Sequence, residues 1–229
     1  MDIPEIALKK VGFDWAKEIG NEFNKDYLRQ LASIISKERT QTAIYPPQKL
    51  TFRAFTETPF SKVKVCIIGQ DPYAGPDEAD GLAFSCPGVN GQTPSFEKIY
   101  NQFVKQFPNH FCTNMLNGDL KGWASEGVLL LNSALTVKHR QYGSHTERWK
   151  PFIARVVESL QKKEYVLFVL LGGTAKQFAK YIKSPHEVIM LEHPAYAARQ
   201  NREWYAEDIF HKINKYLEFK NVKPINWEK

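Results

Sequence analysis

Four short apolar runs constrain the fold of this chain more than any other feature of its sequence. They cover residues 63–69, 127–133, 165–171 and 187–191 and are rich in valine, isoleucine and leucine. Runs this short are typical of β-strands rather than helices. Strands that are apolar throughout are buried from both sides, as in a parallel sheet between two layers of helices. We therefore predict an α/β fold with a central four-stranded, largely parallel sheet flanked on both faces by helices.

Apolar residues spaced as on one face of a helix occur before, between and after these runs. Asp14 is expected to cap an N-terminal helix whose apolar residues recur about once per turn, at Ile19, Phe23, Tyr27, Leu31 and Ile34 or Ile35. Ser95 is expected to cap a helix with an inward face of Phe96, Ile99, Tyr100, Phe103 and Val104. Further helices are predicted over residues 148–163, 174–182 and 202–218.

The chain is long enough to bury one large core. Of its 229 residues 43% are hydrophobic, and we predict a single domain over residues 1–229. Within it, residues 1–60 are expected to form an N-terminal helical segment and connector, and residues 61–229 the core. The connector is the stretch 40–60, which contains three prolines.

Charge and cysteine content narrow the class of protein. The formal net charge of +6 favours an anionic partner such as nucleic acid. Cys66, Cys86 and Cys112 form no Cys-x-x-Cys pair, so neither a disulfide framework nor a zinc site is supported. No apolar run approaches the ~20 residues of a membrane span, and no signal-like N-terminus is present. We predict a soluble, cytoplasmic protein.

Polar side chains follow three of the four predicted strands. Asp71 comes after the first strand, on a loop that Pro72 stiffens; Asn132 ends the second, and His193 follows the fourth. In open parallel sheets ligands bind at the carboxyl ends of the strands, so we expect these three side chains to converge there. Each could alternatively be an ordinary turn residue.

These side chains suggest hydrolysis combined with base recognition. A carboxylate can activate water or offset positive charge, while an imidazole donates to a leaving group. The carboxamide of Asn132 presents a donor and an acceptor that match the edge of a nucleobase, and Phe84 offers a stacking face, with Tyr73 as a second nearby ring. A packing role for Phe84 is the alternative.

At these residues the sequence resembles family 1 of the uracil-DNA glycosylases. The resemblance runs from about Lys62 to Trp227 and depends on the order and spacing of several motifs. These are Gly69-Gln70-Asp71-Pro72-Tyr73, Gly81-Leu82-Ala83-Phe84-Ser85, Thr93-Pro94-Ser95, residues 118–124, Leu129-Leu130-Leu131-Asn132, residues 144–148, His193-Pro194 and residues 223–227.

The resemblance implies a DNA repair enzyme of base excision repair that needs no metal or cofactor. Such an enzyme flips deoxyuridine out of single- or double-stranded DNA and hydrolyses its N-glycosidic bond, leaving free uracil and an abasic site. It further implies that a proteinaceous uracil-glycosylase inhibitor is a partner, and we expect a monomer.

The resemblance also implies roles for individual residues. Asp71 would position and activate water, and His193 would be the neutral donor to uracil O2. Asn132 would read the O4/N3 edge of the base. The remaining roles are stacking for Phe84, exclusion of the thymine methyl for Tyr73, lining of the pocket for Gln70, and phosphate binding for Pro94 and Ser95.

Two departures from the family pattern bear on DNA binding. Ala74 stands where the family usually has His, and residues 193–198 read His-Pro-Ala-Tyr-Ala-Ala in place of His-Pro-Ser-Pro-Leu-Ser. The Leu that wedges into DNA is therefore missing, and Ala197 is too small to replace it. Tyr196 and Arg199 are the candidates to fill the gap, and we favour Arg199 for its reach and charge.

Three other functions are weighed against this interpretation. A metal-dependent phosphoesterase could use Asp71, Asp77, Glu78, Asp80 and His193, although these acids lack recognised ligand spacing. A nucleotide-binding module could use Gly172-Gly173 as a phosphate nest, although such a pair is more often a tight turn. The third is a non-catalytic or weakly active DNA-binding relative.

Overall fold

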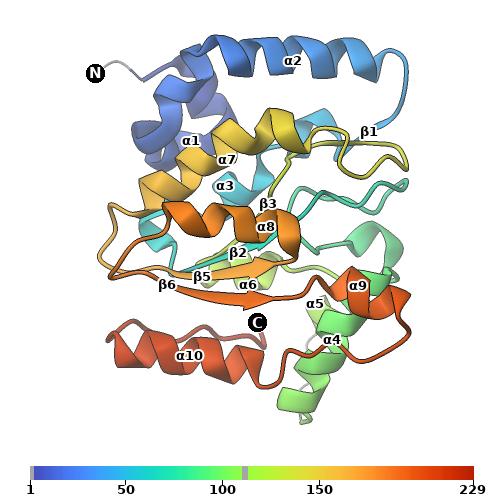
Figure 1. The fold of residues 1–229 in the computed structure, drawn as a ribbon, viewed down its shortest axis with the longest axis vertical. Helices are drawn as coiled ribbons and strands as arrows, with labels where there is room; N and C mark the ends of the chain where they lie inside the picture. Colours follow the sequence, from blue (N-terminus) through green and yellow to red (C-terminus); the bar gives the residue numbers. More distant parts are fainter. Residues whose placement is uncertain (1–2, 110–112) are drawn as a thin grey trace.

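The computed structural model, which describes residues 3–109 and 113–229, is built around one parallel sheet. Its strands are β2 (Val65–Gly69), β3 (Val128–Asn132), β5 (Leu167–Leu171) and β6 (Glu187–Leu191), in the order β3-β2-β5-β6 (Figure 1). All three neighbouring pairs are parallel. The four strands coincide with the four apolar runs, which confirms the predicted sheet.

Burial along the strands follows their position in the sheet. Every residue of β2, β3 and β5 is buried, whereas β6, at an edge, is only partly covered. The register pairs Gly69, the last residue of β2, with Asn132, the last residue of β3. The carboxyl ends of these two strands therefore lie level.

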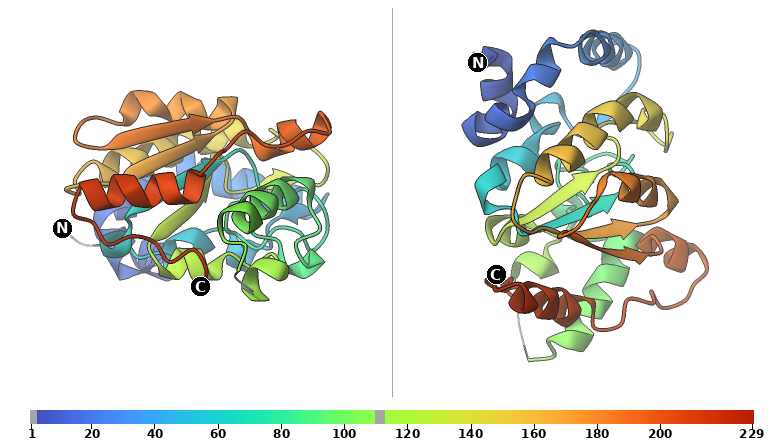
Figure 2. Two further views of the ribbon diagram at one scale, coloured as in Figure 1. Left: turned by 90° about the horizontal axis from the view of Figure 1, so that it is seen from below. Right: turned by 60° about the vertical axis from the view of Figure 1, so that its left-hand side comes forward.

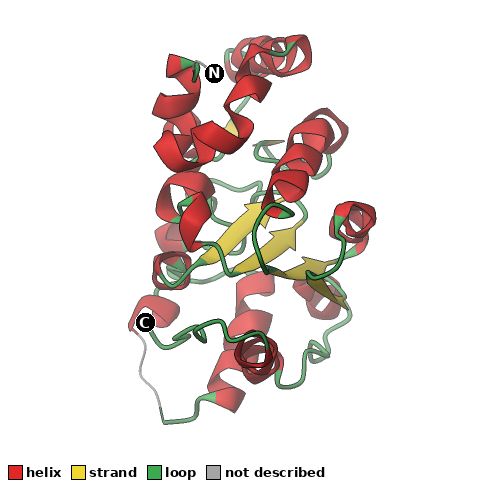
Figure 3. Ribbon diagram, turned by 90° about the vertical axis from the view of Figure 1, so that its left-hand side faces the viewer, coloured by secondary structure: helices red, strands yellow, loops and turns green. Residues whose placement is uncertain are grey.

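Helices cover both faces of the sheet, as predicted. On one face lie α7 (Thr146–Leu160) and α8 (Gly173–Lys176), and on the other lie α4 (Pro94–Gln106) and α10 (Ile209–Phe219) (Figures 1 and 3). Beyond α7 lie α1 (Glu5–Ile19) and α2 (Asp26–Arg39), which both contact it (Figure 2).

The N-terminal segment differs from the prediction. Asp14 does not cap a helix: it lies inside α1, where its carboxylate accepts hydrogen bonds from the backbone N–H and hydroxyl of Ser61, both at 2.7 Å. A 3-10 turn, Gly20–Asn24, separates α1 from α2. The apolar residues of both helices pack into the same core, so their spacing along the sequence looks like that of one helix.

The predicted connector 40–60 contains regular structure. Strand β1 (Ile44–Tyr45) pairs antiparallel with β4 (Val137–Lys138), and α3 (Arg53–Glu57) follows. Just after β4, the backbone N–H of Arg140 donates to the carbonyl of Ala74 at 3.0 Å. The segment after β4 is thereby fastened to the loop that follows β2.

Other helix boundaries also need correction. Thr93 rather than Ser95 caps α4, since its hydroxyl accepts from the N–H of Phe96, and Val104 is exposed. The predicted helix 174–182 is α8 followed by a 3-10 turn, and α10 begins only at Ile209. Besides α3, three short helices were not predicted: α5 (Thr113–Leu116), α6 (Lys121–Ser125) and α9 (Pro194–Arg199).

Two further predictions concern cysteines and membrane spans. Cys66 and Cys86 are buried free thiols, and burial raises the pKa of both; Cys112 lies outside the described residues. Within residues 3–109 and 113–229, no helix is both long and apolar enough to cross a membrane.

Candidate active site

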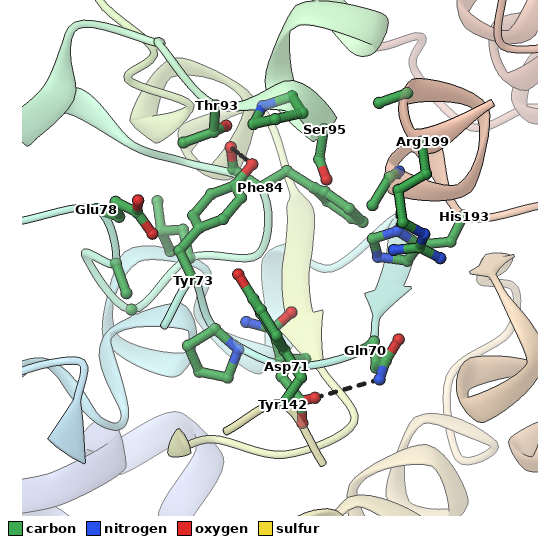
Figure 4. Close-up of a pocket in the computed structure, with 18 residues that line it drawn as sticks. Gln70, Asp71, Tyr73, Glu78, Phe84, Thr93, Ser95, Tyr142, His193 and Arg199 are labelled. Atoms are coloured by element: carbon green, nitrogen blue, oxygen red, sulfur yellow. Dashed lines mark hydrogen bonds between the residues drawn. The ribbon is translucent and has the colours of Figure 1, made fainter. Parts of the chain in front are cut away.

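A cavity of about 530 Å³ opens at the carboxyl ends of β2 and β3 (Figure 4). Nine of the ten predicted site residues line it, namely Gln70, Asp71, Tyr73, Phe84, Pro94, Ser95, Asn132, His193 and Arg199. Tyr196 is the exception. Segments from the two strand ends, α4 and α9 are thus brought to one place, as the strand-end argument predicts.

The floor of the cavity depends on Gly69. A Cβ at this position would lie 2.9 Å from Oδ1 of Asn132 and 2.9 Å from Cζ of Phe84. Any larger residue would therefore displace both side chains. Only glycine lets the amide of Asn132 and the ring of Phe84 meet over the end of β2.

Phe84 has the left-handed backbone conformation that non-glycine residues rarely adopt, with φ of 67°. Two hydrogen bonds hold it: the N–H of Ala83 donates to the carbonyl of Leu130 at 3.1 Å, and the Tyr73 hydroxyl donates to the carbonyl of Phe84 at 3.2 Å. Strained residues that are held this way concentrate at functional sites. The conformation directs the ring into the cavity, 5.5 Å from the His193 ring.

Both carboxylate oxygens of Asp71 accept hydrogen bonds. The N–H of Gly143 donates to Oδ2 at 2.8 Å and the hydroxyl of Thr146 to Oδ1 at 3.0 Å, while Nε2 of Gln70 approaches Oδ2 at 3.3 Å. Burial raises the pKa of Asp71, and these three hydrogen bonds partly offset that rise. The carboxylate is therefore fixed in orientation and more basic than a free aspartate.

The segment that holds Asp71 is itself anchored to the N-terminal helices. Buried His145 contacts Oε2 of Glu38 on α2 through Nε2, at 2.8 Å, and the hydroxyl of Thr136 through Nδ1, at 2.7 Å. The indole N–H of Trp149 also donates to that hydroxyl, at 2.8 Å. His145 thus fixes the start of α7, next to Thr146.

The imidazole of His193 is held in one tautomer. The N–H of Ala195 donates to Nδ1 at 3.1 Å, so Nδ1 must be unprotonated and the ring proton sits on Nε2. Burial, and then the charge of Arg199, lowers the pKa of His193 to about 4. The ring is neutral near pH 7, with an N–H available to donate.

Helix α4 points its N-terminus at the cavity. Pro94 and Ser95 form its first turn and line the wall, next to the capping Thr93. The first N–H groups of a helix lack intrahelical acceptors and carry partial positive charge. This end of α4 is therefore suited to a negatively charged group.

The packing of helix α9 shows which of its residues could take the place of the Leu that wedges into DNA in the family. Ala197 is fully buried, so this position faces the protein core and a larger side chain there would not reach DNA. Arg199 is exposed and lines the cavity, whereas Tyr196 is exposed but stands outside it.

Several residues of the site were missed by sequence reasoning. Gly143 acts through its backbone N–H, for which no residue type is diagnostic. Thr146 lies within residues 144–148, but a threonine at that place does not by itself indicate a contact with a distant carboxylate. Tyr142, an exposed aromatic in a polar loop, lines the cavity, and burial raises the pKa of its hydroxyl, as do nearby Glu78 and Asp71 (Figure 4).

The acids proposed for a phosphoesterase are not assembled around one point. Asp80 forms an ion pair with Arg53 and accepts from the hydroxyl of Ser85, and Glu78 accepts from the N–H of Gly75. In the described part of the chain, no three His, Cys, Asp or Glu side chains are grouped as a metal site would require. The donor set therefore does not support that function.

The Gly172-Gly173 pair serves packing rather than phosphate binding. Gly172 has φ of 89°, and a Cβ there would lie 2.9 Å from Cβ of His193. Its absence of a side chain lets the loop that carries His193 pack against the end of β5. Helix α8, which follows, has only four residues.

Comparisons with known proteins agree with the chemistry of the cavity. The sequence model of the uracil DNA glycosylase superfamily matches residues 55–218. A uracil-DNA glycosylase of Oceanobacillus iheyensis is 38% identical, covering 93% of each chain, and one of Amoebophilus asiaticus is 39% identical, covering 93% of this chain and 96% of its own.

A solved structure supports the same grouping. The mimivirus uracil-DNA glycosylase, 28% identical, superposes with a TM-score of 0.82 over 93% of this chain and 86% of that chain. The family model matches most of the chain, and relatives near 38% identity match almost its full length, so both comparisons indicate the same family. The chain belongs to the uracil DNA glycosylase superfamily.

Proposed function

We propose that this protein excises uracil from DNA by hydrolysing the N-glycosidic bond of deoxyuridine. The observation that carries the proposal is that a fixed, basic carboxylate at Asp71 and a neutral N–H donor at His193 line the same cavity. The curated relatives bear the name uracil-DNA glycosylase. No observation favours a non-catalytic relative, since Asp71, Asn132 and His193 all line the one cavity.

Asp71 and His193 divide the work of bond cleavage. As the glycosidic bond breaks, positive charge develops on the sugar and negative charge on the leaving base. Asp71 positions and activates water and offsets the positive charge. His193 donates from Nε2 to O2 of the departing uracil, where a preorganised donor is most effective.

The other cavity residues select the base. Asn132, at the floor, presents donor and acceptor groups to the O4/N3 edge of uracil, and Phe84 stacks on the ring. Tyr73 bars the methyl group of thymine, and Gln70 completes the wall. Pro94 and Ser95, at the N-terminus of α4, bind DNA phosphate.

The proposal extends to partners and organisation. The substrate is uracil-containing DNA, single- or double-stranded, and the chain acts as a monomer with one domain over residues 1–229. A mimivirus UNG variant, 27% identical, has been solved in complex with UGI. We propose that a proteinaceous inhibitor of this kind binds here as well, by covering the same cavity.

A labelled single strand with one uracil tests the function. After incubation and alkali, we expect cleavage at the uracil position, and none in a control strand with thymine there. Activity should survive a chelator, because no step requires a metal. A uracil strand that stays intact with the wild-type protein would refute the proposal.

The Tyr73→Ala change should admit thymine. The ring is the proposed steric barrier, and one methyl group in a pocket typically decides discrimination of about 10- to 200-fold. Because the Tyr73 hydroxyl also holds Phe84, Tyr73→Phe is the matched control: it loses that hydrogen bond but keeps the barrier. The comparison is thymine release from the thymine strand. If Tyr73→Ala releases none, the barrier lies elsewhere.

The Arg199→Ala change should impair excision from a uracil-adenine duplex more than from a single strand. We propose that Arg199 enters the space left by the flipped nucleotide, and unstacking costs a few kcal/mol in duplex but much less in a single strand. Arg29→Ala, on α2, matches the lost charge at another exposed position. Initial rates at fixed salt decide: equal losses on both substrates would mark Arg199 as a phosphate contact only.

A further inference from the structure

We propose that Tyr196, Arg202 and Tyr205 form a stacking platform for unpaired bases of the DNA strand that leaves the cavity. The proposal rests on the proposed function, because it needs a DNA strand threaded past the site. It adds a binding surface that bond cleavage does not itself require. Tyr205 and Arg202 belong to none of the motifs that carry the family resemblance.

The platform is built on one immobilised guanidinium. Arg202 lies 5.6 Å from the centroid of the Tyr196 ring and 4.8 Å from that of Tyr205. Its two terminal nitrogens contact the two carboxylate oxygens of Glu192, each at 2.6 Å, and Nη1 also donates to the carbonyl of Glu203 at 3.0 Å. The guanidinium therefore cannot swing away, and both rings have a fixed neighbour.

Both rings nevertheless remain open to solvent. Tyr196 is 48% exposed and Tyr205 66% exposed. The neighbouring Trp204 is buried, and its indole N–H donates to the carbonyl of Glu192 at 3.0 Å, so the backbone that carries Tyr205 is anchored. Rigid, exposed aromatic side chains on an anchored segment lose little conformational entropy when a ligand stacks on them.

The platform continues directly from the cavity. Ala195, Ala198 and Arg199 line the cavity, and because the last two follow Ala195 by three and four residues, all three lie on one side of α9. Tyr196 lies on the adjoining face, and its ring centroid is 5.9 Å from the guanidinium carbon of Arg199. A strand leaving the cavity past Arg199 meets Tyr196 first and then Tyr205.

The charge of Arg199, unpaired within the described part of the chain, and the guanidinium between the two rings favour a nucleic acid strand over a protein as the ligand of the platform. Glu192 compensates Arg202, while Arg199 has no carboxylate partner among the residues that the structure describes. A free cation beside exposed rings is the arrangement that binds single strands, with phosphate at the cation and bases on the rings. Two tyrosines separated by a guanidinium form no continuous apolar patch of the kind a protein interface buries.

The occupant must be unpaired because duplex bases already stack on each other. Their faces become available only in single-stranded DNA or where the helix has been opened. The platform therefore predicts tighter binding of single strands that carry bases next to the uracil. It makes no demand on the identity of those bases, since every base offers a π-face.

The test measures binding of a labelled single strand with one central uracil by fluorescence anisotropy, in the Asp71→Asn background to prevent turnover. The strand is compared with versions that carry abasic spacers on the 5′ or the 3′ side of the uracil. Loss of one stacked base should raise Kd about tenfold. We expect Tyr205→Ala to raise Kd by that factor, Tyr205→Phe to bind normally, and Phe219→Ala, an exposed ring at the far end of α10, to have no effect.

The spacer strands separate stacking from other effects. When the abasic spacers lie on the side of the uracil whose bases contact the platform, they should weaken DNA binding by the protein that keeps Tyr205. Its Kd should then equal that of the Tyr205→Ala variant. If Tyr205→Ala binds every strand normally, or if its defect persists with spacers on both sides, the platform is refuted. Failure of the proposed function would instead appear as no uracil release by the wild-type chain, which this binding measurement does not use.

Discussion

The Asp71→Asn variant will lose almost all uracil release while it still binds uracil-containing DNA. A general base typically contributes about 10²- to 10⁴-fold to the rate, and an amide can neither accept a proton from water nor offset positive charge. The substitution barely changes volume, so the cavity and its stacking ring remain. One local contact does change: with the amide oxygen kept toward the N–H of Gly143, the NH2 group faces the hydroxyl of Thr146, which must then accept instead of donate.

Two measurements isolate the carboxylate in this variant. Asp77→Asn is the matched control: Asp77 is an exposed acid on the same loop with φ of 58°, a conformation that Asn tolerates well, so its turnover should be unchanged. Single-turnover rates report the chemical step and anisotropy reports binding. Turnover of Asp71→Asn within a few fold of wild type would remove this carboxylate from the mechanism.

Loss of the His193 imidazole will slow excision by about 10²- to 10³-fold, the typical effect of deleting one preorganised donor to a developing negative charge. His193→Ala tests this directly. His211→Ala, at an exposed position on α10, is the control and should leave the rate unchanged. A rate for His193→Ala near that of wild type would show that another group serves the leaving base.

The pH profile gives a second, independent reading of His193. Its folded-state pKa of about 4 lies below the ordinary value of 6.5, so the ring should stay neutral, and the rate should show no step from His193, as pH falls through 6.5. Acid inactivation has two sources, protonation of Asp71, whose pKa burial raises, and protonation of His193 as pH nears 4. The unfolded chain binds this proton near pH 6.5, so stability should fall progressively between pH 6.5 and 4. A rate that halves near pH 6.5 would contradict the assigned pKa.

The sheet was predictable because its signal is local. Each of β2, β3 and β5 is buried at every residue, and a strand covered on both faces must be apolar throughout. The helices were less predictable from the sequence. Apolar spacing reports which residues face the core but not where the chain turns, so α1 and α2 merged into one predicted helix. Helix α9 was missed because its start at His193-Pro194 is also typical of a loop.

Some residues of the candidate site could be predicted from the sequence and others could not. Cavity residues with a distinctive side chain, such as Asp71, Asn132 and His193, could be named from the sequence, and the parallel topology explains why strand ends converge. The backbone groups that tune them could not. The N–H of Gly143 orients Asp71 and the N–H of Ala195 sets the tautomer of His193, yet every residue but proline has such a group. The burial of Ala197 likewise depends on how α9 packs.

The contacts that hold Asp71 have a consequence for when the chain becomes active. Its partners Gly143 and Thr146 lie 72 and 75 residues further along the sequence, and His193 follows later still. During synthesis the carboxylate therefore leaves the ribosome as an unrestrained acid, long before the groups that orient it. Neither a nascent chain nor a proteolytic fragment that ends before α9 contains a complete cavity. Abasic sites, which are themselves lesions, are thus made only by a chain that has been synthesised at least through α9 and has folded.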